Sequence, residues 1–154
     1  MQYEILDVSY IKNVGELVMK LTNEISERTG QQQFDINTTM ICNNLREFMS
    51  ESQYTVVGAC FSGTLIGFGT ICESCSLYAG GRFGVIQEFY VLPEYRCKGV
   101  GRHLIARIIE YGQSKMWRRL ELCTPPVPEF DSTLSFYEGT GFEITGGHKM
   151  KYML

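Results

Sequence analysis

Apolar and polar residues in the first 50 positions follow one strand-like and two helix-like patterns. Residues 2–8 predict a strand. The polar residues 31–37 predict a loop, and Thr38 is a suitable start for a second helix. We expect this helical part to border a substrate cleft. Between the strand and the loop, apolar side chains recur at helical spacing and predict a first helix that ends near Gly30. These apolar residues are Val14, Leu17, Val18, Leu21 and Ile25.

From Tyr54 onward, β-branched, aromatic and glycine residues predict strands. Residues 55–61 and 64–72 flank a Ser-Gly pair and predict a hairpin, and residues 82–92 predict the next antiparallel strand. A helical stripe follows at Val100, Leu104, Ile105, Ile108 and Ile109. The last predicted elements are a strand at 120–123, a helix at 132–139, and strands at 141–144 and 150–154.

The predicted order, β-α-α-β-β-β-α-β-α-β-β, defines an α/β protein. The chain has 154 residues, of which 44% are hydrophobic and 12% aromatic, enough for one well-packed core. No linker or repeat interrupts it. We therefore expect residues 1–154 to form a single domain.

The net charge of the chain makes some classes of binding partner unfavourable. A formal net charge of -3 argues against binding to nucleic acid or to an anionic membrane. The N-terminus lacks a secretory signal, no apolar run is long enough to span a membrane, and the six cysteines do not resemble a disulfide framework. Cys72 and Cys75 have the spacing of half a zinc site, but no second pair follows. We expect a cytoplasmic protein without a metal.

The segment 90–102 carries the most chemical information. It predicts a strand that stops at Pro93 and enters a helix through a basic turn with two glycines. The first amides of a helix have no intrahelical acceptor, and Gly99 and Gly101 let an anion approach the backbone closely. The phosphate loop of nucleotide hydrolases and the dinucleotide fingerprint are both absent. The sequence still predicts phosphate binding, with mobile positive charge from Arg96, Lys98 and Arg102.

Two motifs give the chain a family resemblance. Residues 96–101, RCKGVG, match the signature [QR]-x-x-G-x-[GA] of the GNAT superfamily of acyl-CoA-dependent N-acetyltransferases, and residues 134–142 resemble its F-Y-E-x-x-G-F element. The resemblance implies the GNAT acyl-CoA N-acyltransferase fold, an α/β fold whose mixed central sheet of about six to seven strands is flanked by about four helices. One departure is Phe130, where many members have an asparagine.

The resemblance implies a site for acetyl-CoA made mainly of backbone groups. Strand residues would hold the pantetheine arm, because a strand that splays from its neighbour exposes amide and carbonyl groups to the amide-rich cofactor. The amides of residues 97–102 would wrap the diphosphate. The implied cofactor-binding residues are Phe89, Tyr90, Val91, Arg96, Cys97, Lys98, Gly99, Val100, Gly101, Arg102 and Tyr137.

The family reaction is direct attack of a neutral amine on the thioester, through a tetrahedral intermediate, with loss of the coenzyme A thiolate. The amine must lose a proton, the oxyanion needs a donor, and the thiolate benefits from an acid. By resemblance, Tyr137 is the acid, and the backbone N–H of Val91 or a neighbour is the oxyanion donor.

The general base remains open between Glu88, Glu121 and a water molecule. Strand alternation places Glu88 on one face with Ile86 and Tyr90.

The favoured acceptor is a primary amine of a small molecule. The alternatives are an amine of a protein or peptide, or a catalytically silent protein that binds acyl-CoA as a sensor. The resemblance is also compatible with a homodimer.

Overall fold

The computed structural model describes every residue of the chain except residue 33. It divides into two compact units, residues 1–122 and residues 123–154, which we describe separately. The single domain expected over residues 1–154 stays a prediction.

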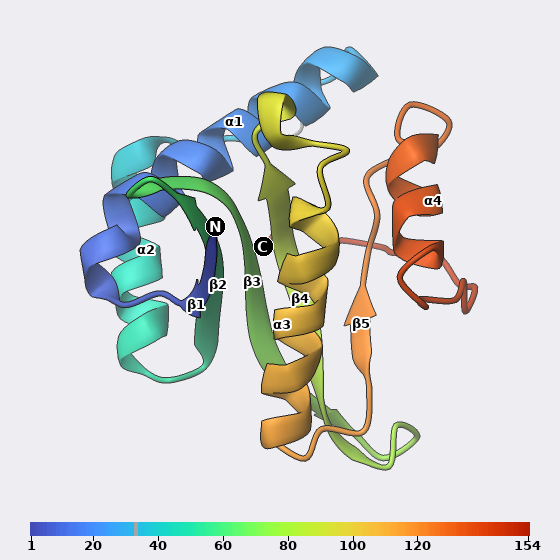
Figure 1. Ribbon diagram of the computed structural model, residues 1–154. Helices are drawn as coiled ribbons and strands as arrows, with labels where there is room; N and C mark the ends of the chain where they lie inside the picture. The colour runs from blue at the N-terminus through green and yellow to red at the C-terminus, as the bar shows by residue number, and fades with distance from the viewer. Residues whose placement is uncertain (33) are drawn as a thin grey trace. The chain divides into compact units, whose positions relative to one another are not determined.

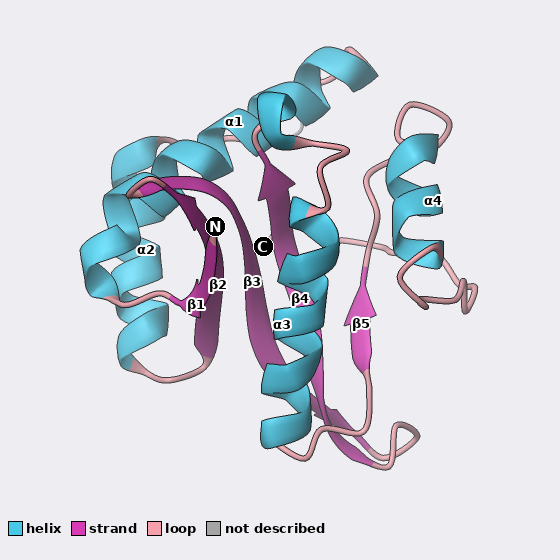
Figure 2. Ribbon diagram, in the orientation of Figure 1, coloured by secondary structure: helices cyan, strands magenta, loops and turns pink. Residues whose placement is uncertain are grey.

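The first unit is a five-stranded mixed sheet with helices (Figure 1). The strand order is β1-β2-β3-β4-β5; β1 to β4 are antiparallel, and β5 is parallel to β4. Figure 2 separates the strands from the helices. In chain order the elements are β1 (Gln2–Ile5), η1 (Val8–Tyr10, a 3₁₀ helix), α1 (Ile11–Thr29), α2 (Thr38–Ser50), β2 (Tyr54–Phe61), β3 (Thr64–Ser76), β4 (Gly81–Val91), η2 (Pro93–Tyr95, also 3₁₀), α3 (Val100–Ser114) and β5 (Leu120–Leu122).

The helices cover both faces of this sheet. Helix α3 packs on the face to which Gly69 belongs, and a Cβ added at Gly69 would lie only 2.8 Å from Ile108 Cδ1. The missing side chain therefore lets the helix approach the strand closely. On the other face, Phe48 of α2 lies 5.7 Å from the ring of Tyr54, measured between ring centroids. The α3 side chains buried in the core are Val100, Leu104, Ile105 and Ile108, four of the five predicted; Ile109 is only half-buried.

Local sequence signals explain the ends of several elements. Gly30 adopts a left-handed φ of 67° and ends α1, and the N–H of Met40 donates to Asn37 Oδ1 at 2.9 Å, which caps α2. Both predicted helices are confirmed. Ser62 and Gly63 have φ values of 48° and 78°, as a tight two-residue hairpin turn requires. The loop predicted at 31–37 includes residue 33, which lies outside the described residues.

The first strand is shorter than predicted. It ends at Ile5 instead of Val8. The reason is local: the carboxylate of Asp7 accepts from the N–H of Ser9 at 2.8 Å and turns the chain into η1. Such side-chain to backbone bonds compete with strand pairing.

The second unit holds α4 (Asp131–Glu138) and irregular segments on either side. The final strands predicted at 141–144 and 150–154 are wrong, so the described residues form five strands instead of six or seven. Ile144, Met150 and Tyr152 are 69%, 89% and 88% exposed, so these β-prone residues bury no face. Strand propensity requires a partner strand and a packed face to take effect.

None of the helices in the described part of the chain is long and apolar enough to cross a membrane.

Candidate active site

The turn between β4 and α3 has the backbone of an anion cradle. Cys97 and Gly99 have left-handed φ values of 58° and 82°, and Gly99 is the N-cap residue of α3. The first turn of α3 contains no acidic residue, so its amides and the positive end of the helix dipole meet no opposing carboxylate on that turn. This geometry suits a diphosphate. Lys98 and Arg102, both exposed, place positive charge around it.

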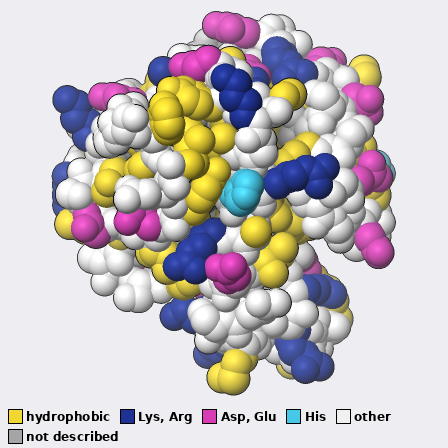
Figure 3. Space-filling model, in the orientation of Figure 1, with side chains coloured by type: hydrophobic (Ala, Val, Ile, Leu, Met, Phe, Trp, Pro, Cys, Tyr) yellow, Lys and Arg dark blue, Asp and Glu magenta, His cyan; other side chains and the backbone are white. Residues whose placement is uncertain are grey.

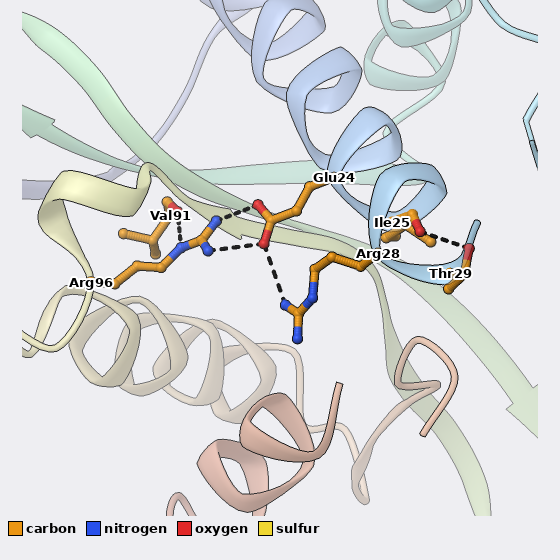
Figure 4. Close-up of polar contacts among 6 residues, drawn as sticks. All are labelled: Glu24, Ile25, Arg28, Thr29, Val91 and Arg96. Atoms are coloured by element: carbon orange, nitrogen blue, oxygen red, sulfur yellow. Dashed lines mark hydrogen bonds and ion pairs between the residues drawn. The ribbon is translucent and has the colours of Figure 1, made fainter. Parts of the chain in front are cut away.

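The side chain of Arg96 is fixed, whereas the sequence predicts a mobile charge there (Figure 4). Its Nε donates to the carbonyl of Val91 at 2.8 Å, and its two terminal nitrogens donate to the two carboxylate oxygens of Glu24 at 3.0 and 2.7 Å. The guanidinium also lies 5.2 Å from the centroid of the Tyr90 ring. Arg96 therefore ties the turn to the end of β4 and to α1.

The bidentate pair also shifts both pKa values. Hydrogen bonding from Arg96 lowers the pKa of the Glu24 carboxyl, and the hydrogen bond to Glu24 raises the pKa of Arg96. Arg28, one helical turn after Glu24, adds a longer contact of 3.5 Å to the same carboxylate. This cluster stays charged at neutral pH, and α1 is held to the turn electrostatically as well as by packing.

Strand β4 extends beyond its neighbour β5. The parallel ladder ends at the pair of Ile86 and Leu122, whereas on its other side β4 pairs with β3 up to Val91. Residues 87–91 thus continue past the end of β5 in the first unit, and they include the predicted pantetheine-binding residues Phe89, Tyr90 and Val91. Together with the turn at 96–102, this stretch fits an amide-rich cofactor with a diphosphate.

Glu88 lies in a bulge of β4 that Thr70 holds in place. Gly69 pairs with Phe89 and Ile71 pairs with Ile86, so two residues of β4 stand opposite Thr70 alone. The N–H of Glu88 donates to Thr70 Oγ1 at 2.9 Å, and the hydroxyl of Thr70 donates to the Glu88 carboxylate. Thr70 thus satisfies the backbone at the bulge and also orients the carboxylate.

A second hydroxyl completes this network. Tyr54 also donates to Oε2 of Glu88, and its Oη lies 3.0 Å from Thr70 Oγ1. Burial and the neighbouring carboxylate raise the pKa of Tyr54, so its phenol stays protonated and able to donate. The sequence analysis did not identify Thr70 or Tyr54; the only signal was a threonine within an apolar strand.

The bulge also changes which side chains share a face. Ile86 stands opposite Ile71, on the face of the sheet that carries α3. Glu88 bonds to Thr70 on the other face, where Tyr90 lies opposite Phe68. The prediction that Glu88 shares a face with Ile86 is therefore wrong, because the extra residue reverses the alternation of the strand.

The other predicted catalytic groups have defined surroundings. Glu121 on β5 forms an ion pair with Arg119 at 2.7 Å. In the second unit, the ring of Tyr137 meets Phe142 edge-on, with centroids 5.8 Å apart. Burial raises the pKa of Tyr137, so its hydroxyl is protonated at neutral pH, as a general acid requires. The roles of Tyr137, Glu88 and Glu121 stay predictions.

The mixed sheet, the protruding end of β4 and the glycine-bearing turn into α3 are the arrangement expected of an acyl-CoA-dependent transferase. Residues 17–142 match the family model described as the acetyltransferase (GNAT) family. The chain belongs to this family, which confirms the resemblance, the fold class and the acyltransferase activity predicted from the sequence. A search of curated proteins gave no match.

Solved structures show the same fold at low sequence identity. A ribosomal-protein-alanine N-acetyltransferase from Brucella melitensis biovar Abortus 2308 is 18% identical, with a TM-score of 0.74. The match covers 99% of this chain and 100% of that chain. An aminoglycoside N-acetyltransferase, AAC(6')-Iy, in complex with CoA is 18% identical, with a TM-score of 0.81 and coverage of 99% and 93%. A mutant protein from Bacillus halodurans is 18% identical, with a TM-score of 0.83 and both chains fully covered.

Proposed function

We propose that this acetyltransferase transfers the acetyl group of acetyl-CoA to a primary amine of a small molecule. The observation that carries the choice of acceptor is a recess of about 350 Å³ beside α1. Its volume lies in the range of small-molecule sites, about 300–1,000 Å³. It is lined by Met19, Thr22, Asn23, Ser26, Glu27, Gln32, Phe34 and Ile36.

The composition of the recess suits a polar cation. Glu27 is the ionisable residue in its lining, beside the neutral hydrogen-bonding side chains of Asn23 and Ser26. A carboxylate at such a site attracts an alkylammonium ion, the form in which a primary amine arrives at neutral pH. The recess lies on the same turns of α1 as Glu24, which binds Arg96 of the cofactor turn. The choice of this recess as the acceptor site therefore rests on its size and composition.

The roles proposed for the chain follow from its geometry. Main-chain groups of residues 89–91 and 97–102 hold acetyl-CoA, and the N–H of Val91 or a neighbour donates to the thioester oxygen as negative charge develops there. The hydroxyls of Tyr54 and Thr70 both donate to Oε2 of Glu88. The Glu88 carboxylate accepts the amine proton directly or through water. Tyr137 donates a proton to the departing thiolate.

Calorimetric titration with acetyl-CoA, followed by thiol release against a panel of small amines and a panel of peptides, tests this function. We expect cofactor binding and thiol release with small polyamines. The two acceptor classes need separate panels because one structural neighbour is named for a ribosomal protein and another for aminoglycosides. Thiol release only with peptides would show that the acceptor is a peptide or protein amine and not a small molecule. Binding of acetyl-CoA without thiol release would favour the catalytically silent sensor.

A paired substitution tests the recess itself. Glu27→Gln removes its carboxylate and should raise KM for the amine about tenfold with little change in kcat, because the ammonium loses a binding partner. Glu16→Gln is the matched control, since Glu16 is also exposed on α1 but does not line the recess. Equal KM values for the two variants would exclude this recess as the acceptor site.

A further inference from the structure

A second recess of about 350 Å³ lies at the far end of α3 from the cofactor turn. It is bordered by the start of β2, by β3 and β4, and by the last turn of α3; the lining residues used below are Thr55, Glu73, Arg82, Tyr111, Lys115 and Trp117. With 15 residues in α3, the two ends of the helix are separated by about 22 Å. The recess is therefore distinct from the acetyl-CoA site.

Two aromatic rings form a rigid wall of this recess. Trp117 meets Tyr111 edge-on, with ring centroids 5.5 Å apart and planes at 81°. The indole fits there because Gly84 lacks a side chain: a Cβ added at that position would collide with Trp117 Cζ3. The hydroxyls of Thr55 and Tyr111, two residues of the lining, are hydrogen-bonded at 2.9 Å. The wall is therefore held in place by the fold.

The charges of the recess do not balance. Its one carboxylate, Glu73, accepts from Arg82 and, at 2.6 Å, from the indole N–H of Trp117. The hydrogen bond from Trp117 and the nearby cations lower the pKa of Glu73, so it remains ionised. Lys115 forms no ion pair among the described residues, and its Nζ lies over the ring of Tyr111, 5.4 Å from the centroid. Two cations and one anion leave one positive charge beside the aromatic wall.

We propose that this recess binds a small aromatic carboxylate. The carboxylate would pair with Lys115, and the flat ring would pack against Trp117 and Tyr111. Such a ligand matches the excess positive charge and the aromatic wall of the recess, because its carboxylate neutralises the charge and its ring covers apolar ring surface. A cationic ligand would instead face two positive groups, and a neutral one would leave the excess positive charge of the recess in place.

Trp117 is the single tryptophan of the chain, so its fluorescence reports on the recess directly. Benzoate, benzamide and benzylamine share a ring and differ in charge, and each is titrated into the intact protein at constant ionic strength. We expect a saturable fluorescence change with benzoate, at least about tenfold tighter binding than benzamide, and no response to benzylamine. Equal affinities for benzoate and benzamide would overturn the proposal.

Substitutions of Lys115 test whether benzoate binds in this recess. Lys115→Gln should reduce benzoate affinity to the level of benzamide, while Lys115→Arg keeps it within a few-fold. Lys149→Gln, in the second unit, is the matched control and should leave affinity unchanged. Unfolding curves verify that each variant is folded. Retained affinity in Lys115→Gln, or loss of benzoate binding on addition of acetyl-CoA, would show that the ligand does not bind as proposed.

Discussion

Replacing Thr70 by Val tests whether one hydroxyl holds both the bulge and the carboxylate of Glu88. The two side chains have nearly the same shape, and Thr70 is only 1% exposed, so the substitution removes hydrogen bonds without opening a cavity. The Glu88 N–H would lose its acceptor and the Glu88 carboxylate would lose a donor. An unsatisfied buried donor costs about 1–3 kcal/mol, and a hydrogen bond to a charged group contributes about 1.5–3 kcal/mol.

We therefore expect Thr70→Val to lower the free energy of unfolding by about 3 kcal/mol, which corresponds to about 6–12 °C in Tm for a chain of this size. Urea and thermal unfolding measure the loss, and thiol release measures the accompanying fall in turnover. Thr55→Val is the matched control: the Thr55 hydroxyl bonds to the neutral hydroxyl of Tyr111, and the loss of this bond should cost about 1 kcal/mol. If the two variants lose the same stability, Thr70 does not have this double role.

Three further outcomes are expected. Gly99→Ala and Gly30→Ala both place a Cβ at a left-handed φ and should each cost about 1 kcal/mol of stability, but only Gly99→Ala should weaken acetyl-CoA binding; equal calorimetric affinities would refute the cradle. Tyr137→Phe should lower turnover in the thiol-release assay and leave cofactor affinity within a few-fold; unchanged turnover would remove Tyr137 from the acid role. Because Arg96 lowers the pKa of Glu24, the stability that their pair contributes is present above the unfolded pKa of about 4.3 and is lost as pH falls through the folded value. The stability difference between the native chain and Glu24→Gln should therefore shrink below about pH 4 in urea unfolding, and a difference independent of pH would contradict this.

Figure 3 shows cationic, anionic and apolar side chains on the face in view. This agrees with the small net charge of -3. In the two proposals above, recognition depends on local groups, Glu27 in one recess and Lys115 in the other.

The sequence by itself determined the elements whose signals are local. The helical stripe from Val100 to Ile108, the hairpin at Ser62 and Gly63, and the glycine-bearing turn before α3 depend on spacing and on backbone freedom within a few residues. The same turn, together with the C-terminal motif, carried the family resemblance. These parts were predictable because no distant partner is needed to form them.

Only the tertiary structure decided the rest. Arg96 looks like a mobile cation in the sequence, but it is held by Glu24, which lies 72 positions earlier in the chain. The bulge at Glu88 reverses strand alternation because Thr70, on the neighbouring strand, offers its hydroxyl to the displaced N–H. The C-terminal residues have β-prone side chains but bury no face, so they form no strand in the described structure. In each case the outcome depends on the side chain or strand that meets the residue across space, which periodicity along the chain does not encode.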